Sequence, residues 1–197
     1  MAITRGLLTY EAEGMEGGPY HSRKLHVPSA SSGLTIGRGY DMKEKQSSKI
    51  EGDLIEAKVP EPMAQTLARA SGLAGQKAKD FIVGNQLEDF EISMESQEIL
   101  FNLIYDELSK DVQRICNKPD CVAKYGPVDW TNLHPKIKDV LVDLRFRGDY
   151  TPKSRLLIQK IVSDNHLERF TASLTDQEAW RQVPPDRFQR RVDFLNN

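Results

Sequence analysis

The sequence contains only two cysteines among its 197 residues, at positions 116 and 121. So few thiols exclude a disulfide-rich scaffold and a zinc site built from four cysteines. Two alternatives remain open for this pair. Cys116 and Cys121 close a small disulfide loop if the protein acts in an oxidising compartment, or they remain free thiols. In either case we expect them to take no part in the chemistry.

The chain also lacks an excess of either charge, with 27 Lys and Arg against 29 Asp and Glu. Dedicated nucleic-acid-binding proteins usually carry a strong basic excess, so we expect no nucleic-acid partner. No apolar run approaches the roughly 20 residues of a membrane-spanning helix, and we expect no membrane span. The first 14 residues, MAITRGLLTYEAEG, do not have the pattern of a signal peptide. These absences, together with 39% hydrophobic and 28% charged residues, indicate a soluble globular protein.

Cofactor and metal motifs are missing as well. Gly37-Arg38-Gly39 lacks the third glycine of a dinucleotide fingerprint, because position 42 is Met. The four histidines do not show the H-E-x-x-H spacing of a zinc protease. We therefore expect no cofactor and no metal site.

The residues that are present change character near position 42. Residues 1–42 are rich in Gly, Ser and Pro, and Gly33, Gly37 and Gly39 punctuate a short β-like segment. After Asp41, apolar residues recur at helical spacing. We therefore predict an α+β fold that is mostly α. It has a small N-terminal β-hairpin lobe over residues 1–46, a helical lobe over residues 47–197, and a cleft between the lobes as the natural ligand site.

The helical lobe shows its clearest pattern in the middle of the chain, where apolar residues form one stripe over residues 94–115. A second clear helix is expected to end before Gly148, which also explains the Arg147-Gly148-Asp149 tripeptide without any role in adhesion. The predicted helices cover residues 4–13, 47–58, 62–71, 75–84, 94–115, 135–146, 156–162 and 185–195.

Three closely spaced carboxylates, Glu11, Glu13 and Glu16, precede the glycine-punctuated segment that carries Thr35 and Asp41. A glutamate packed at the end of a helix and a hydrated aspartate in a β-turn have pKa values pushed apart, which suits a general acid and a charge stabiliser. Two such carboxyl groups are what most glycosidases use to cleave a glycosidic bond. The alternative is that all three glutamates are solvated charges at a helix end, and spacing alone does not separate the two interpretations.

A resemblance favours the first interpretation. Glu13-Gly14, followed by the segment SGLTIGRGYD at residues 32–41, resembles the catalytic segment of the pesticin-type branch of phage-lysozyme-like muramidases. The six-residue step from Thr35 to Asp41, with Thr first, is the order of that branch. Fainter similarity extends to the long central helix and to the C-terminal segment that begins at Trp180. The resemblance implies a single lysozyme-like catalytic domain over residues 1–197.

The resemblance also implies an activity and its residues. The protein is expected to be a muramidase, which cleaves the β-1,4 bond between N-acetylmuramic acid and N-acetylglucosamine in peptidoglycan and inverts the anomeric centre. Glu13 would be the general acid, with Glu11 as its rival and Glu16 as a weaker third. Asp41 would stabilise the oxocarbenium-like transition state and orient a water molecule, and Thr35 would hold that water. For inversion, the two carboxyl groups should stand roughly 6.5–9.5 Å apart.

The loop between the catalytic positions supplies candidate substrate-binding residues. Tyr20, His21, Arg23 and His26 are expected to line the sugar cleft and hydrogen-bond to it, unless they belong to a merely solvated loop. Arg38 is a further candidate, because it could contact substrate, pair with an acidic catalytic residue and tune its pKa, or point to solvent.

The biological setting follows from the substrate, which lies outside the cytoplasm. Without a recognised signal peptide, we expect delivery by another route, as an antibacterial effector or bacteriocin-type toxin, and action in the periplasm or cell wall of a target bacterium. A cognate immunity protein would then be a partner. The alternatives are a phage endolysin, a chitinase-like hydrolase and a non-catalytic wall-binding domain. We expect a monomer, and we expect Arg187, Arg190 and Arg191 to form a solvated basic edge or to attract the anionic wall.

Overall fold

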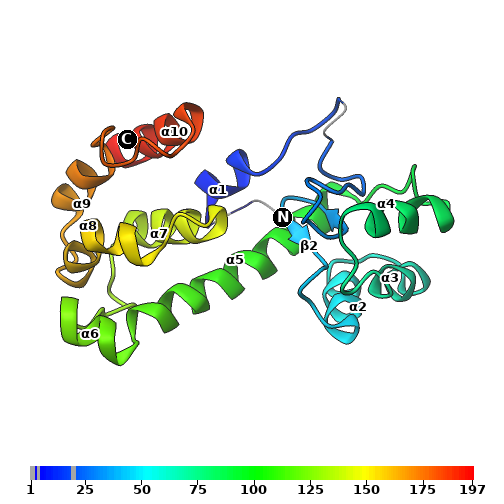
Figure 1. The fold of residues 1–197 in the computed structure, drawn as a ribbon, viewed down its shortest axis with the longest axis horizontal. Coiled ribbons are helices and arrows are strands. Elements are labelled where there is room, and N and C mark those ends of the chain that lie inside the picture. Colours follow the sequence, from blue (N-terminus) through cyan, green and yellow to red (C-terminus); the bar gives the residue numbers. More distant parts are fainter. Residues whose placement is uncertain (1–2, 4, 19–20) are drawn as a thin grey trace. The chain divides into compact units, whose positions relative to one another are not determined.

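The computed structural model describes residue 3 and residues 5–18 and 21–197. The predicted substrate-binding residue Tyr20 lies outside these residues. The described chain is mostly helical and contains one two-stranded antiparallel hairpin, as Figure 1 shows. The predicted α+β, mostly α class is thereby confirmed.

The chain divides into two compact units. Of the described residues, one unit contains residue 3 and Glu13–Ile104 and is called the hairpin unit here. The other contains residues 5–12 and Tyr105–Asn197 and is called the C-terminal unit. The hairpin unit is larger than the expected lobe of residues 1–46, because backbone hydrogen bonds join the hairpin region to later residues. Gly75 N–H donates to the Ser32 carbonyl (2.9 Å), and Gly72 N–H donates to the Lys43 carbonyl (3.1 Å).

The hairpin unit has a core formed by the hairpin and the helices that follow it. Alternate residues Leu34, Ile36, Tyr40 and Met42 are fully buried. The Tyr40 hydroxyl donates to the buried carboxylate of Asp53 on the following helix (2.7 Å), which fixes the hairpin to that helix. The elements of this unit are β1 (Thr35–Ile36), β2 (Tyr40–Asp41), α2 (Ser47–Glu56), α3 (Glu61–Ala68), α4 (Gly75–Gly84) and the beginning of α5 (Met94–Cys116).

The C-terminal unit is entirely helical within the described residues. Its apolar core is centred on α7 and includes the buried Trp180. Gly148 adopts a left-handed conformation (φ 87°) at the end of α7, as predicted from the sequence. The elements are α1 (Leu7–Ala12), the end of α5, α6 (Pro119–Tyr125), α7 (Pro135–Arg147), α8 (Pro152–Ser163), α9 (Leu167–Leu174) and α10 (Pro185–Asn196). No helix in the described part of the chain combines the length and apolar character that crossing a bilayer requires.

The prediction that three arginines of the last helix form a solvated basic edge is wrong for two of them. Arg187 and Arg191 are buried and both bind the carboxylate of Asp143 on α7, at 2.8 and 2.7 Å. Arg190 alone of the three is exposed. The attraction of two guanidinium groups to a buried carboxylate outweighs the usual preference of arginine for water.

The two cysteines are free thiols, and both are buried. Cys116 ends α5, where its Sγ lies 3.3 Å from the Tyr150 hydroxyl and accepts a hydrogen bond from Gln159. Burial and the nearby Cys116 raise the pKa of the Cys121 thiol. Both cysteines therefore serve as small core residues in the C-terminal unit.

Candidate active site

The hairpin places the two predicted water-orienting residues opposite each other. Thr35 pairs with Asp41 and Ile36 with Tyr40 in the antiparallel register. Residues directly opposite in such a pair project to the same face, with Cβ atoms about 4.5–5.5 Å apart. The turn needs glycine on both sides of Arg38, because Gly37 and Gly39 have φ values of 61° and 89°. The glycine pattern of the motif therefore creates the proximity of Thr35 and Asp41.

Asp41 is held in one orientation by two backbone amides. Its Oδ2 accepts from Gly33 N–H (3.0 Å), and its Oδ1 accepts from Lys43 N–H (2.8 Å). The carboxylate lies so close over Gly33 that a Cβ at this residue would be 2.3 Å from Oδ1. Glycine is therefore required at position 33 for Asp41 to keep its place.

Thr35 is buried, with 3% of its surface exposed, and its hydroxyl donates to the Gly33 carbonyl (3.2 Å). Its backbone forms a reciprocal pair with His26, at 2.9 and 2.8 Å. His26, Thr35 and Asp41 are consequently aligned in one row across three extended segments.

Glu13 follows the last residue of α1 and is half-buried. The next residue is bound to the hairpin turn: Arg38 Nη1 donates to the Gly14 carbonyl (3.2 Å). A Cβ on Gly14 would lie 2.7 Å from Arg38 Cγ, so the Glu-Gly pair also allows close packing. The structure thus joins the Glu13-Gly14 pair to the hairpin that carries Thr35 and Asp41.

Glu16, the third candidate acid, lies in a hydrogen-bonded ionic network. Its carboxylate accepts from Arg23 Nε (2.9 Å) and Gln97 Nε2 (2.7 Å), and Arg38 Nη2 is 3.6 Å away. Partial burial acts to raise the pKa of Glu16, but the hydrogen bonds from Arg23 and Gln97 outweigh it and hold the pKa below its ordinary value of 4.5. A carboxylate that binds its proton so weakly is a poor general acid.

The lowered pKa of Glu16 gives a prediction about stability. A carboxyl group whose pKa is lower in the folded state stabilises that state above the unfolded pKa, and this contribution is lost as the pH falls through the folded value. The melting temperature of wild type should therefore exceed that of Glu16→Gln near neutral pH, and the gap should close as the pH falls below the ordinary carboxyl pKa of 4.5 and through the lower folded-state pKa. Thermal unfolding of both proteins over this pH range measures the gap; a gap that widens on acidification would contradict the assignment.

The two loop histidines, His21 and His26, differ in whether a ring nitrogen remains available to bind a ligand. His21 Nδ1 accepts from Gly17 N–H (2.7 Å), so its Nε2 carries the proton that is donated to Glu91 Oε1 (3.0 Å). Both nitrogens of His21 are thereby used within the protein. His26 Nδ1 donates to the Lys24 carbonyl (2.9 Å), which leaves its Nε2 as an acceptor.

Two adjoining hollows lie along this loop, of about 560 and 750 Å³. Of the four described residues that were predicted to bind substrate, three line one or both of them: His21, Arg23 and His26. Arg23 also pairs with Glu91 (2.5 Å), which leaves its guanidinium less available to a ligand. Arg38 differs from these residues because it is buried. The other described residues that line the hollows are Glu16, Gly17, Gly18, Lys24, Leu25, Val27, Pro28 and Glu88.

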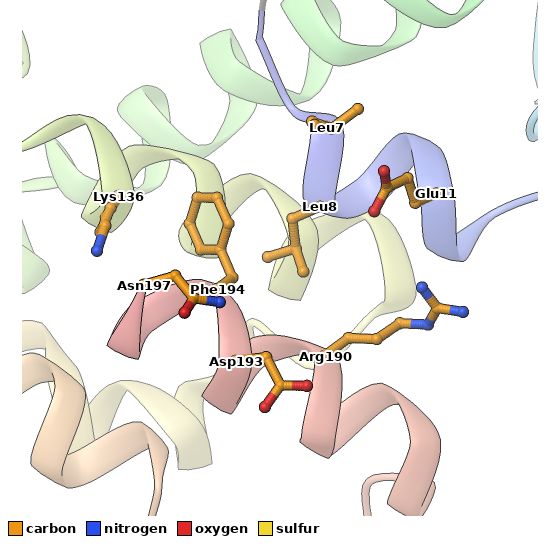
Figure 2. A pocket seen from close by; sticks show the side chains of 8 residues that line it. All are labelled: Leu7, Leu8, Glu11, Lys136, Arg190, Asp193, Phe194 and Asn197. Atoms are coloured by element: carbon orange, nitrogen blue, oxygen red, sulfur yellow. The ribbon is translucent and has the colours of Figure 1, made fainter.

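Glu11, the rival acid, belongs to the C-terminal unit. It lies on α1 and lines a separate pocket of about 420 Å³. Figure 2 shows its carboxylate and the guanidinium of Arg190 on opposite sides of this pocket, with Leu8 and Phe194 between the two helices. The structure therefore does not bring Glu11 into the compact unit that contains Thr35 and Asp41.

The sequence interpretation missed Gln97, which links the acid segment to α5. Its Oε1 accepts from the buried Ser22 hydroxyl (2.7 Å), and its Nε2 binds Glu16. A signal was present, because Gln97 precedes Leu100 and Ile104 by three and seven residues and so interrupts the apolar stripe. Within the described residues, no cluster of three His, Cys, Asp or Glu side chains could hold a metal ion.

The fold and site together define a mostly helical protein in which a glycine-rich hairpin gathers acidic and hydroxyl side chains. The family model described as "Domain of unknown function (DUF8812)" matches residues 6–192, and the chain belongs to this family. No curated protein matches the sequence. The family description assigns no activity, so a function has to be argued from the site.

Proposed function

We propose that this protein is an N-acetylmuramidase that cleaves the β-1,4 bond between N-acetylmuramic acid and N-acetylglucosamine of peptidoglycan. The supporting observation is the pairing of Thr35 with Asp41 on a hairpin whose turn binds the carbonyl next to Glu13. The three residue types in this order are those of the pesticin-type muramidases that the segment resembles. The adjoining hollows supply room for sugar rings on the same unit.

In this reaction Glu13 protonates the glycosidic oxygen as it leaves the anomeric carbon. Asp41, which two backbone amides hold in place, faces the developing positive charge on the sugar and orients the attacking water. The Thr35 hydroxyl donates to Gly33, so it would contact the water as an acceptor, and its burial requires the covering residues to move. Attack from the face opposite the leaving group inverts the anomeric centre.

A second candidate function is glycan binding without cleavage. It is favoured by the internal hydrogen bonds of Asp41, both of whose oxygens are satisfied by the protein, and by the burial of Thr35. Such a site would retain the shape of a hydrolase and the hollows along the loop without a water-activating group. Binding with no turnover separates it from the muramidase.

The proposed setting is the periplasm or cell wall of a target bacterium, where an antibacterial effector would meet its substrate. A cognate immunity protein that blocks the site would protect the producing cell. A phage endolysin is the alternative source of the same activity. Co-expression with the product of a neighbouring gene, followed by a test for inhibition, distinguishes the effector from the endolysin.

The direct test is digestion of purified peptidoglycan by the wild-type protein. We expect new reducing ends on N-acetylmuramic acid, identified by mass spectrometry of the reduced fragments, and the inverted anomer as the first product seen by NMR. Cleavage of chitin oligosaccharides with no cleavage of peptidoglycan would instead indicate a chitinase-like enzyme. Binding to peptidoglycan without any new reducing ends would support the second candidate function.

A further inference from the structure

Arg38 has an unusual position for an arginine at the tip of a hairpin turn. Only 7% of its surface is exposed, although Gly37 and Gly39 on either side form a tight turn. Burying a guanidinium group is unfavourable unless hydrogen bonds and charges compensate it. The partners of Arg38 therefore indicate what its burial achieves.

Two residues that bind Arg38 lie on the segment that follows α1. Arg38 Nη1 donates to the Gly14 carbonyl (3.2 Å), and Nη2 is 3.6 Å from Glu16 Oε1. Its aliphatic stem packs on the Gly14 Cα, where no side chain could fit. Glu16 is itself oriented by Arg23 and by the buried Gln97. Arg38 thus contacts both ends of the 14–16 segment, at Gly14 and at Glu16.

We propose that Arg38 is a positioning residue, which fastens the segment containing Glu13 to the hairpin that carries Thr35 and Asp41. It does not contact substrate. Its guanidinium and stem set where the chain leaves α1, and hence where the carboxyl of Glu13 stands relative to the water-orienting pair. The effect on catalysis rests on the proposed muramidase function, whereas the fastening itself can be measured without any activity.

The first experiment compares Arg38→Met with Arg69→Met, a matched control. Arg69 is an exposed arginine of the same unit whose guanidinium donates to Asn85, away from the site. Hydrogen exchange measured by mass spectrometry should become faster at residues 13–18 in Arg38→Met and stay at the wild-type rate in Arg69→Met.

In the activity assay, Arg38→Met should lower kcat by about 10²-fold with little change in KM, because a shift of about 1 Å in a catalytic group has an effect of this size. Arg38→Lys should restore part of kcat.

The second experiment uses the close packing of Gly14 and remains informative if Arg38→Met folds poorly. The variant Gly14→Ala places a Cβ against Arg38 Cγ and should loosen the same segment and lower kcat. In an Arg38→Ala background the closest of the clashes is gone and the contacts with Ser22 Cβ and Oγ at 3.1 Å remain, so Gly14→Ala should have a smaller further effect. This non-additivity is the signature of direct coupling between the two residues.

The outcomes separate the two proposals. If wild type cleaves peptidoglycan but Arg38→Met keeps wild-type kcat and wild-type exchange, the positioning role is wrong. Additive effects of the Gly14 and Arg38 substitutions would overturn it as well. If wild type does not cleave peptidoglycan but Arg38→Met loosens residues 13–18, the fastening stands and the muramidase function fails.

Discussion

Glu13→Gln should lower the rate of reducing-end release from peptidoglycan by roughly 10²–10⁴-fold, the usual contribution of a general acid. The amide keeps the shape of the side chain but is far too weak an acid to protonate the leaving oxygen. Binding should persist, because the hollows along the loop do not include Glu13. Initial rates with soluble peptidoglycan fragments and a separate co-sedimentation assay with whole peptidoglycan measure the two properties independently.

Glu11→Gln and Glu16→Gln are the comparison variants, because the sequence leaves all three glutamates as candidates. Glu11 lies in the C-terminal unit and should be dispensable for the reaction. Glu16 is held ionised by Arg23 and Gln97, so its removal should disturb the segment and give a smaller loss than Glu13→Gln. If Glu11→Gln shows the largest loss and Glu13→Gln little, the acid is Glu11 and the assignment of Glu13 is wrong.

The long elements of the fold could be predicted because their apolar periodicity is strong. The helix predicted over residues 94–115 is observed as Met94–Cys116, and that predicted over residues 135–146 as Pro135–Arg147. Two short helices, α6 and α9, were not predicted. Residues 117–120, Asn-Lys-Pro-Asp, are of types that favour a turn. In the structure Pro119 begins α6, because proline is well suited to the first turn of a helix.

The candidate site could be predicted in part, because glycine positions determine the hairpin. Gly37 and Gly39 indicate a tight turn, and the spacing of six residues between Thr35 and Asp41 then places these two residues opposite each other. The role of Arg38 could not be predicted in this way. A lone arginine between two glycines is normally solvated, and its burial depends on the carbonyl of Gly14, which lies 24 residues earlier in the chain.

The buried charges of the C-terminal unit could not be predicted from the sequence either, because their partners also lie far away in the chain. Asp143 occupies a helix face together with Val140 and Leu144, where a carboxylate is not expected. Its partners, Arg187 and Arg191, are more than 40 residues away in sequence. Periodicity identifies the face that a helix buries, but it does not identify which distant side chain neutralises a charge on that face.

Asp143→Ala should therefore be the most destabilising of the substitutions considered, with a loss of about 3–5 kcal/mol in the free energy of unfolding of the C-terminal unit. The Asp143 side chain is fully buried, and it accepts hydrogen bonds from Thr9 on α1 (3.2 Å), Arg187 (2.8 Å) and Arg191 (2.7 Å). Removing the carboxylate takes a shared ion-pair partner from two buried guanidinium groups. Of these, Arg191 also binds Asp149 (2.9 Å), whose other carboxylate oxygen pairs with Arg147.

Urea unfolding followed by tryptophan fluorescence measures this loss in the relevant unit, because both tryptophans, Trp130 and Trp180, lie in the C-terminal unit. Asp164→Ala is the matched control: its carboxylate pairs with Lys160 on the surface of the same unit (2.6 Å) and should contribute about 0–1 kcal/mol. The double variant Asp143→Leu with Arg187→Met should lose less stability than Asp143→Ala, since it also removes one of the two buried guanidinium groups and fills the space. Equal losses for Asp143→Ala and Asp164→Ala would show that the buried network does not hold α1, α7 and α10 together.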